Sequence, residues 1–232
     1  MSTVLVIPDL HAPGHLKSFK SFVLDVAIRF AVDQIVQLGD LVDFHYISRH
    51  PTDPIALNPA QELELAKEEL SNWTAMFPHV KCCYGNHDLI PVRQAATLGM
   101  PEELIVPLNE MLGLPDTWEW ANAWDVDGVI YEHGLGSNGM YGCKNTALKY
   151  RKSYVQGHTH SYAGVHYLDG PVDTIFGMNA GCGVDYHKYH SKYGRHIFKV
   201  KPSIGCGVVI DGFEAHYIPM DLKKYGERNI RI

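Results

Sequence analysis

Five short polar blocks in this chain combine carboxylate, imidazole and amide side chains, the groups that bind divalent metal ions. The blocks are Asp9-Leu10-His11, Gly39-Asp40-Leu41-Val42-Asp43, Gly85-Asn86-His87-Asp88, Glu132-His133-Gly134 and Gly157-His158-Thr159-His160. The candidate ligands within them are Asp9, His11, Asp40, Asn86, His133, His158 and His160. Mixed oxygen and nitrogen donors favour Mn²⁺, with iron, Zn²⁺ and Ni²⁺ as alternatives, whereas Mg²⁺ and Ca²⁺ prefer oxygen alone.

These donors are numerous enough to hold two ions if one carboxylate bridges them, and we expect Asp40 to be the bridge because it follows a central strand. Two ions about 3.5 to 4 Å apart can clamp a phosphoryl group and generate hydroxide near neutral pH. One such block can arise by chance, but five after five apolar runs point to a common site. The sequence therefore predicts a dinuclear metallohydrolase.

The apolar runs before the blocks are expected to be buried strands whose ends meet at one rim. Residues 4–8, 34–38 and 80–84 have this pattern. Between the first two runs, apolar residues recur at steps of three and four, which predicts a helix over residues 17–31 and a βαβ unit. The Asp9/His11 and His158/His160 pairs have i, i+2 spacing, so in extended segments both members of a pair would point the same way.

Further helices are predicted over residues 59–77, 101–113 and 140–151, the first from Asn58 as N-cap and Pro59 at the first helical position. The second half is richer in strands. Its three Asp-Gly pairs, at Asp127, Asp169 and Asp211, predict hairpin turns. Parallel units followed by antiparallel hairpins suggest two sheets packed face to face with helices outside.

Length and composition favour one domain. The chain has 232 residues, of which 46% are apolar, and a formal net charge of −6, too mild for a protein that coats nucleic acid or an anionic membrane. Its five cysteines form no C-x-x-C pair. With no apolar stretch near about 18 residues and no signal-like start, we expect a cytoplasmic protein without a membrane span. We place the domain at residues 1–220 and a polar C-terminal tail at residues 221–232.

Taken together, the blocks resemble those of the calcineurin-like metallophosphoesterase family, which runs D-x-H, G-D-x-x-D, G-N-H-D/E, H and G-H-x-H in this order. The match spans residues 9–160. The resemblance implies an α/β fold, a four-layer αββα sandwich of two mixed β-sheets flanked by helices. It also implies how the ligands divide, with Asp40 shared: Asp9, His11 and His160 complete the first site, and Asn86, His133 and His158 complete the second.

The resemblance further implies that His87 is a catalytic residue and not a ligand. In the family this histidine assists departure of the leaving group after metal-bound hydroxide attacks phosphorus, and Asp43 would orient its ring and favour the protonated form. One departure concerns substrate. Protein phosphatases and diadenosine tetraphosphatases of the family usually have arginine directly after the second aspartate, where this chain has Phe44.

The remaining substrate contacts are sought among basic residues. Arg93 follows the His87 block, and residues 185–201 interleave cations with tyrosines, among them Lys192, Arg195 and His196. Such a segment suits a phosphodiester backbone with unstacked bases, although a solvated surface loop has the same composition. We expect a phosphodiesterase or nuclease acting on nucleic acid or a nucleotide. The alternatives are a phosphomonoesterase acting on protein or nucleotide and a non-catalytic binding scaffold; the sequence identifies no protein partner.

Overall fold

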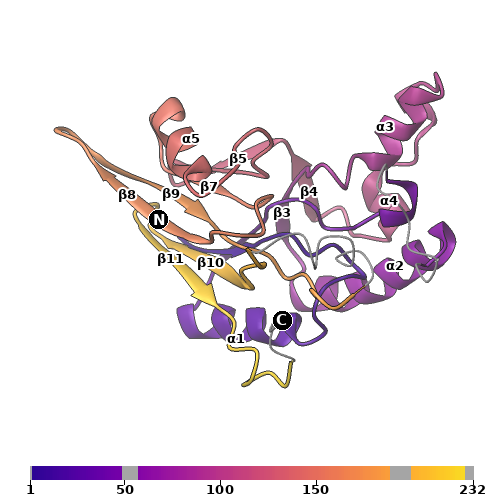
Figure 1. Cartoon of the computed structure of the whole chain (residues 1–232), viewed down its shortest axis with the longest axis horizontal. Helices are drawn as coiled ribbons and strands as arrows, with labels where there is room; N and C mark the ends of the chain where they lie inside the picture. The colour runs from indigo at the N-terminus through magenta and orange to yellow at the C-terminus, as the bar shows by residue number, and fades with distance from the viewer. Residues whose placement is uncertain (1, 49–56, 189–199, 228–232) are drawn as a thin grey trace.

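Two mixed β-sheets pack face to face in the computed structural model, which describes residues 2–48, 57–188 and 200–227 (Figure 1). The six-stranded sheet has the order β11-β10-β1-β2-β3-β4. Its strands are β1 (Thr3–Ile7), β2 (Gln34–Gln37), β3 (Val80–Cys83), β4 (Trp118–Ala121), β10 (Gly205–Ile210) and β11 (Glu214–Pro219). The five-stranded sheet has the order β5-β6-β7-β9-β8. Its strands are β5 (Ala123–Val126), β6 (Val129–Glu132), β7 (Tyr154–Gln156), β8 (Gly164–Asp169) and β9 (Thr174–Asn179).

Strand alternation in β1 shows how the layers form. Val4 and Val6 face the other sheet, in a cluster with Tyr131 and Met178, whereas Leu5 and Ile7 face the helices on the opposite side. Both sets are buried. Helix α1 (Phe19–Phe30) and helix α2 (Pro59–Met76) cover the six-stranded sheet, and helix α5 (Gly142–Tyr150) covers the five-stranded sheet. The predicted four-layer αββα sandwich is therefore confirmed (Figure 1).

The first βαβ unit forms as predicted, with β1 parallel to β2 across helix α1. The helix buries one apolar stripe and ends at Ala31, which has the left-handed backbone conformation (φ 50°). Helix α2 begins with a complete capping box, in which the Asn58 side chain accepts from the Gln61 backbone and the Gln61 side chain accepts from the Asn58 backbone. These local signals explain why both predictions lie within two residues of the observed ends.

The region between residues 84 and 118 differs from the prediction. A single helix was expected over residues 101–113, but the chain forms a 3-10 turn, η2 (Glu102–Leu104), and a short helix, α4 (Leu108–Leu112). Pro107 separates them because proline has no N–H for a helical hydrogen bond. Helix α3 (Ile90–Thr97) was not predicted, although Pro91 lies in its first turn. Outside this region, another 3-10 turn, η1 (His45–Ile47), follows the Asp43 block.

All three Asp-Gly pairs lie in hairpin loops, between β5 and β6, β8 and β9, and β10 and β11. The prediction of antiparallel hairpins was nevertheless wrong for part of the second half. Strands β6, β7 and β9 are mutually parallel because helix α5 forms a crossover between β6 and β7. The last hairpin returns to the first sheet, where β10 pairs antiparallel with β1. Four parallel strands of the first sheet, β1 to β4, and three of the second thus end near the same rim.

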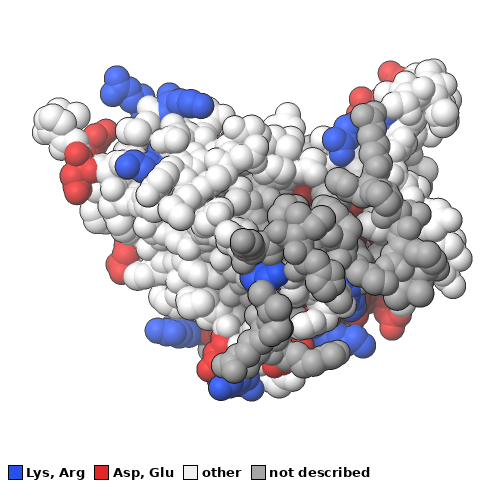
Figure 2. All heavy atoms as spheres, in the orientation of Figure 1, with Lys and Arg blue, Asp and Glu red and all other residues white. Residues whose placement is uncertain are grey.

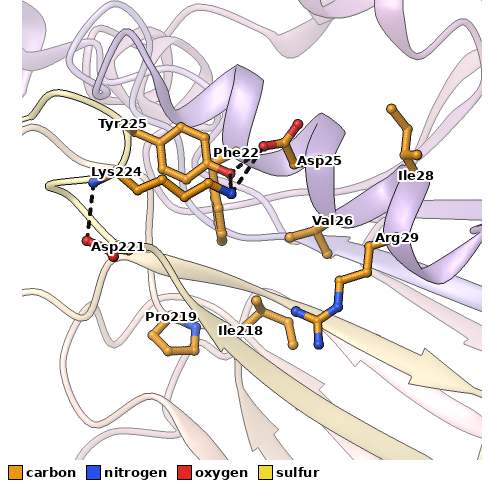
Figure 3. A pocket seen from close by; sticks show the side chains of 10 residues that line it. All are labelled: Phe22, Asp25, Val26, Ile28, Arg29, Ile218, Pro219, Asp221, Lys224 and Tyr225. Atoms are coloured by element: carbon orange, nitrogen blue, oxygen red, sulfur yellow. Dashed lines mark hydrogen bonds and ion pairs between the residues drawn. The ribbon is translucent and has the colours of Figure 1, made fainter.

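Residues 221–227, the described part of the predicted tail, lie along helix α1. The Tyr225 hydroxyl donates to Asp25 over 2.6 Å, and the Tyr225 ring packs on Phe22. Between this segment, helix α1 and β11 lies a pocket of about 410 Å³ that Arg29 also lines (Figure 3). None of the helices within the described ranges has the length and apolarity needed to cross a membrane.

Candidate metal centre

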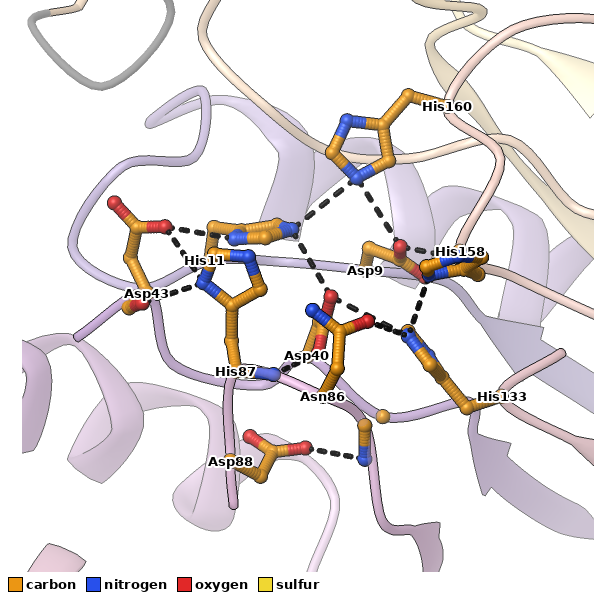
Figure 4. Close-up of polar contacts among 12 residues, drawn as sticks. Asp9, His11, Asp40, Asp43, Asn86, His87, Asp88, His133, His158 and His160 are labelled. Atoms are coloured by element: carbon orange, nitrogen blue, oxygen red, sulfur yellow. Dashed lines mark hydrogen bonds and ion pairs between the residues drawn. The ribbon is translucent and has the colours of Figure 1, made fainter. Parts of the chain in front are cut away.

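The five polar blocks converge at one rim of the sandwich (Figure 4). Three of them follow β1, β2 and β3 of the six-stranded sheet, and two follow β6 and β7 of the five-stranded sheet. Since all five strands are parallel within their sheets, their carboxyl ends bring the blocks together, as in other open α/β sheets. The structure thus gathers all seven predicted ligands, which come from sequence positions as distant as 9 and 160.

The described donor atoms form two neighbouring groups, Asp9, His11 and His160, and Asp40, His133 and His158. A third set, His11, Asp40 and His87, overlaps both, and in each set the ligand atoms lie within 4.8 Å of one another. In the first group, His160 Nε2 lies 3.1 Å from Asp9 Oδ2 and 3.2 Å from His11 Nε2. In the second, His133 Nε2 lies 3.2 Å from His158 Nδ1 and 3.0 Å from Asn86 Oδ1. The two histidines of the H-x-H block therefore belong to different groups, contrary to the expectation that they point the same way.

Asp40 lies between the two groups. Its Oδ2 atom is 3.6 Å from His11 Nε2 and 3.3 Å from His133 Nε2. Its Oδ1 atom accepts a hydrogen bond of 2.7 Å from the His87 backbone N–H, so that oxygen is held on the far side. One oxygen of Asp40 thus faces both groups, which is the placement that a bridging carboxylate requires.

Backbone conformation, and not strand alternation, aims several of these side chains. His11, Asp40 and His158 all have positive φ, at 51°, 48° and 62°. Neither i, i+2 pair is fully extended, because each contains a left-handed residue. Asp9 and His11 nevertheless reach the same donor group, as predicted, whereas His158 and His160 do not. Non-glycine residues in this region cost about 1–3 kcal/mol each, and such strain concentrates at functional sites.

The charges of the group fit a cation. Asp9 and Asp40 are buried, and within the described ranges neither has a lysine or arginine partner. Burial opposes their ionisation, but hydrogen bonds and charges from His160 and His133 outweigh it and hold the pKa of both carboxyls below the usual value. In turn, although burial disfavours its cation, Asp40 raises the pKa of His133 to about 9. Protons on histidine here balance buried carboxylates, and divalent ions would replace those protons on binding.

The tautomer of His133 also suits a ligand. Its Nδ1–H donates 2.9 Å to the Leu38 carbonyl oxygen, which leaves Nε2 to face the other donors. The hydrogen bond to Leu38 also fixes the plane of the His133 ring. The donor set, with its carboxylates, neutral imidazole nitrogens and one amide oxygen, therefore fits two divalent transition-metal ions.

His87 lies beside the first group without joining its hydrogen bonds. Its Nδ1 lies 2.6 Å from the Asp43 carbonyl oxygen and 3.3 Å from Asp43 Oδ1, and its ring meets the His11 ring edge-on at 4.5 Å. Asp43 Oδ1 also lies 2.9 Å from His11 Nδ1. Burial disfavours the cation, but Asp43 and Asp40 outweigh it and raise the pKa of His87 to about 10. Asp43 is therefore placed to orient two rings.

Two glycines allow the Asp40 and Asn86 loops to touch. A Cβ atom on Gly39 would lie 2.6 Å from the Gly85 backbone N, and one on Gly85 would lie 2.1 Å from the Asp40 backbone N. Neither distance is sterically possible. Gln37, which the sequence did not single out, supports the same turn: its Nε2 donates to the Gly39 carbonyl over 2.8 Å, and its Oε1 accepts from the Gly39 N–H. Its signal was a polar residue within an otherwise apolar run.

We expect Gly85→Ala to lower the free energy of unfolding by about 3 kcal/mol, the upper end of the usual cost of overpacking. Urea unfolding in EDTA measures this cost without bound metal. Gly170→Ala is the matched control, because its Cβ would meet only Asp173 at 3.0 Å or more in an exposed loop. Equal unfolding midpoints for Gly85→Ala and Gly170→Ala would contradict the close contact between the Asp40 and Asn86 loops.

The predicted substrate contacts are placed only in part. Arg93 is exposed on helix α3, and its guanidinium donates to the Asn86 carbonyl, so it lies next to a predicted ligand. Lys192, Arg195 and His196 lie outside the described residues. Phe44, which directly follows Asp43, is buried in the apolar core and has positive φ.

Comparison with known proteins agrees with these features. Residues 2–175 match the family model described as calcineurin-like phosphoesterase. No curated protein matches the chain. Among solved structures, a phosphoesterase from E. coli, Yfce, is 18% identical over 90% of this chain and 88% of its own, with a TM-score of 0.44. Vacuolar protein sorting 29 from Cryptosporidium parvum is 12% identical over 89% of this chain and 82% of its own, with a TM-score of 0.44.

Proposed function

The chain belongs to the calcineurin-like phosphoesterase family, and we propose that it is an enzyme that hydrolyses phosphate esters with two divalent metal ions. The observation that carries this proposal is the convergence of two ligand groups around Asp40. Buried carboxylates that are balanced only by histidine are costly unless a cation compensates them. A site with this charge is a place for metal ions.

We assign the first ion to Asp9, His11, Asp40 and His160, and the second to Asp40, Asn86, His133 and His158. Mn²⁺ is the preferred metal, with iron, Zn²⁺ and Ni²⁺ as alternatives. When bound, the pair supplies an activated water and neutralises charge on the phosphoryl oxygens. The contacts of Asp40 Oδ2 with both groups support its role as the shared ligand.

His87 acts as the general acid in this proposal. The contact of its Nδ1–H with the Asp43 carbonyl leaves Nε2 as the nitrogen that can give a proton to the leaving oxygen. The raised pKa of His87, to about 10, favours the protonated ring that this step needs. Asp43 is a positioning residue, since it touches His87 and His11 and not the substrate.

A phosphodiester is the preferred substrate, in nucleic acid or a nucleotide. The residue directly after Asp43 is the buried, apolar Phe44, so this position supplies no guanidinium, which argues against a phosphoprotein monoester. Lys188 donates 2.9 Å to the Pro13 carbonyl, so the basic segment begins beside the Asp9 and His11 loop, and Lys201 lies 4.9 Å from the Tyr186 ring. On the face in Figure 2, the described lysines and arginines stand in separate small groups among acids, which suggests a short contact and not a long nucleic-acid track.

A substrate panel tests the proposal. Bis-p-nitrophenyl phosphate, p-nitrophenyl phosphate and single-stranded DNA are each incubated with Mn²⁺, Zn²⁺ or Ni²⁺, with EDTA as the metal-free control. We expect the diester and the DNA to be cleaved faster than the monoester, and Mn²⁺ to support the highest rate. Cleavage of the monoester alone would overturn the diesterase assignment. No cleavage with any metal would instead favour a binding scaffold.

A further inference from the structure

Asp88 is the one residue of the G-N-H-D block to which the proposed chemistry gives no part. It is buried, and its carboxylate accepts hydrogen bonds from three backbone N–H groups. Asp88 Oδ1 accepts from Leu41 over 2.9 Å and from Val42 over 3.3 Å. Asp88 Oδ2 accepts from Gly85 over 2.9 Å. The two oxygens thus bind two different loops.

The two loops are those that carry the shared ligand and the proposed acid. Leu41 and Val42 directly follow Asp40, and Gly85 directly precedes Asn86 and His87. The loops meet through Gly39 and Gly85, and on the other side of this crossing the His87 N–H binds Asp40 Oδ1. The Asp88 carboxylate therefore joins the two loops on the side away from the metal ligands, and the His87 backbone N–H joins them on the side of the ligands.

A carboxylate is the side-chain group that this position requires. Both of its oxygens are pure acceptors, so one short side chain can satisfy N–H groups on two sides. The isosteric amide of asparagine has only one acceptor oxygen, and its NH₂ group would face an N–H donor of one loop. An unsatisfied buried N–H is costly, so that loop is expected to move away.

We propose that Asp88 is a positioning residue that fixes the Asp40 loop relative to the Asn86 and His87 loop, and so fixes the separation of the two metal sites. Its hydrogen bonds within the described residues go to backbone N–H groups and not to the ligand atoms. The consequence for catalysis rests on the proposed function, whereas the consequence for loop geometry and metal binding does not.

The test compares Asp88→Asn with Glu62→Gln. Glu62 is a matched control because it is a buried carboxylate that, like Asp88, accepts hydrogen bonds from backbone N–H groups, here those of His45 and Tyr46. These two residues are not among the proposed metal ligands. Hydrogen exchange of the metal-free proteins measures how strongly the Leu41, Val42 and Gly85 amides are protected from solvent. Titration with Mn²⁺ reports affinity, and the electron paramagnetic resonance spectrum of the Mn²⁺-loaded protein reports the coupling between the two ions.

For Asp88→Asn we expect at least about tenfold faster exchange at Leu41 or Gly85, Mn²⁺ binding weaker by about 10- to 100-fold, and altered coupling between the ions. Glu62→Gln is expected to lower thermal stability while leaving all three readouts as in the unchanged protein. If Asp88→Asn lost stability but kept amide protection, Mn²⁺ affinity and ion coupling, the residue would be merely structural and the proposal would be overturned.

A measurement on the unchanged protein keeps the proposal testable if the variant does not fold. Amides that share one acceptor group should become exposed together, so Leu41 and Gly85 are expected to show the same opening free energy. Exchange of one amide more than a hundredfold faster than the other would refute the shared anchor. If the protein bound two Mn²⁺ ions but cleaved no ester, the proposed function would fail while the role of Asp88 stood.

Discussion

Asp40→Asn is expected to weaken binding of both metal ions by at least about a hundredfold and to lower turnover by about a thousandfold or more. The reason is geometric. Among the described residues, only Asp40 Oδ2 faces both donor groups. In asparagine an NH₂ group, which cannot bind a cation, can occupy this place while the oxygen keeps the His87 contact. Loss of about 4 kcal/mol of charge stabilisation corresponds to a thousandfold change in rate. Calorimetric titration with Mn²⁺ and steady-state kinetics measure the two effects.

Asp125→Asn is the matched control for this change. Asp125 undergoes the same chemical change on an exposed strand, where its partner is Lys152 at 2.7 Å. Its metal affinity and turnover should equal those of the unchanged protein. If Asp40→Asn lost one ion and retained the other at full affinity, Asp40 would be a ligand of one site and not the bridge.

His87→Ala is expected to reduce kcat by about a hundredfold or more while both metal ions remain bound. The residue contributes no donor atom to either proposed ligand set, and its backbone N–H contact with Asp40 survives the substitution. A fall in kcat with little change in metal content therefore isolates the proton-transfer step. Steady-state kinetics on single-stranded DNA, whose leaving group is an alkoxide, paired with metal analysis of the purified variant, provides both numbers.

His79→Ala is the matched control, because His79 is an exposed histidine just before β3. A leaving group of low pKa needs less help from an acid, so the loss in His87→Ala should shrink with p-nitrophenol esters and grow with alkyl esters. A kcat within fivefold of the unchanged protein on both ester types would remove His87 from the chemistry.

The fold was predictable where local chemistry determines it. Apolar runs of four or five residues predicted β1, β2 and β3, and the capping residues Asn58 and Pro59 marked the start of α2. Strand direction in the second half was not predictable from turns alone. Asp-Gly pairs identify hairpins, but only the packing of helix α5 against β7 and β9 makes β6 and β7 parallel. Pro107 was a local signal for a break in the predicted helix over residues 101–113. The prediction gave more weight to the helical pattern of the flanking residues.

For the site, residue types and order predicted which side chains meet, because strand ends carry them to one rim. How each side chain is aimed was less accessible. Positive φ at His11 and His158 follows from loop closure across the two sheets, and no pattern of neighbouring residue types announces it. The supporting contacts of Gln37 and Asp88 were likewise hidden, since they join backbone groups whose proximity exists only in the folded chain.

The pairing of β10 with β1 determines when the centre can assemble during synthesis. Strand β1 leads into Asp9 and His11, yet its neighbour on one side, residues 205–210, is synthesised after all seven candidate ligands. A nascent chain, or a fragment cut at residue 175 where the family match ends, leaves β1 as an uncovered edge. The candidate centre is therefore supported on both sides of β1 only after β10 has been made, and expression of such a fragment should yield aggregate in place of folded protein.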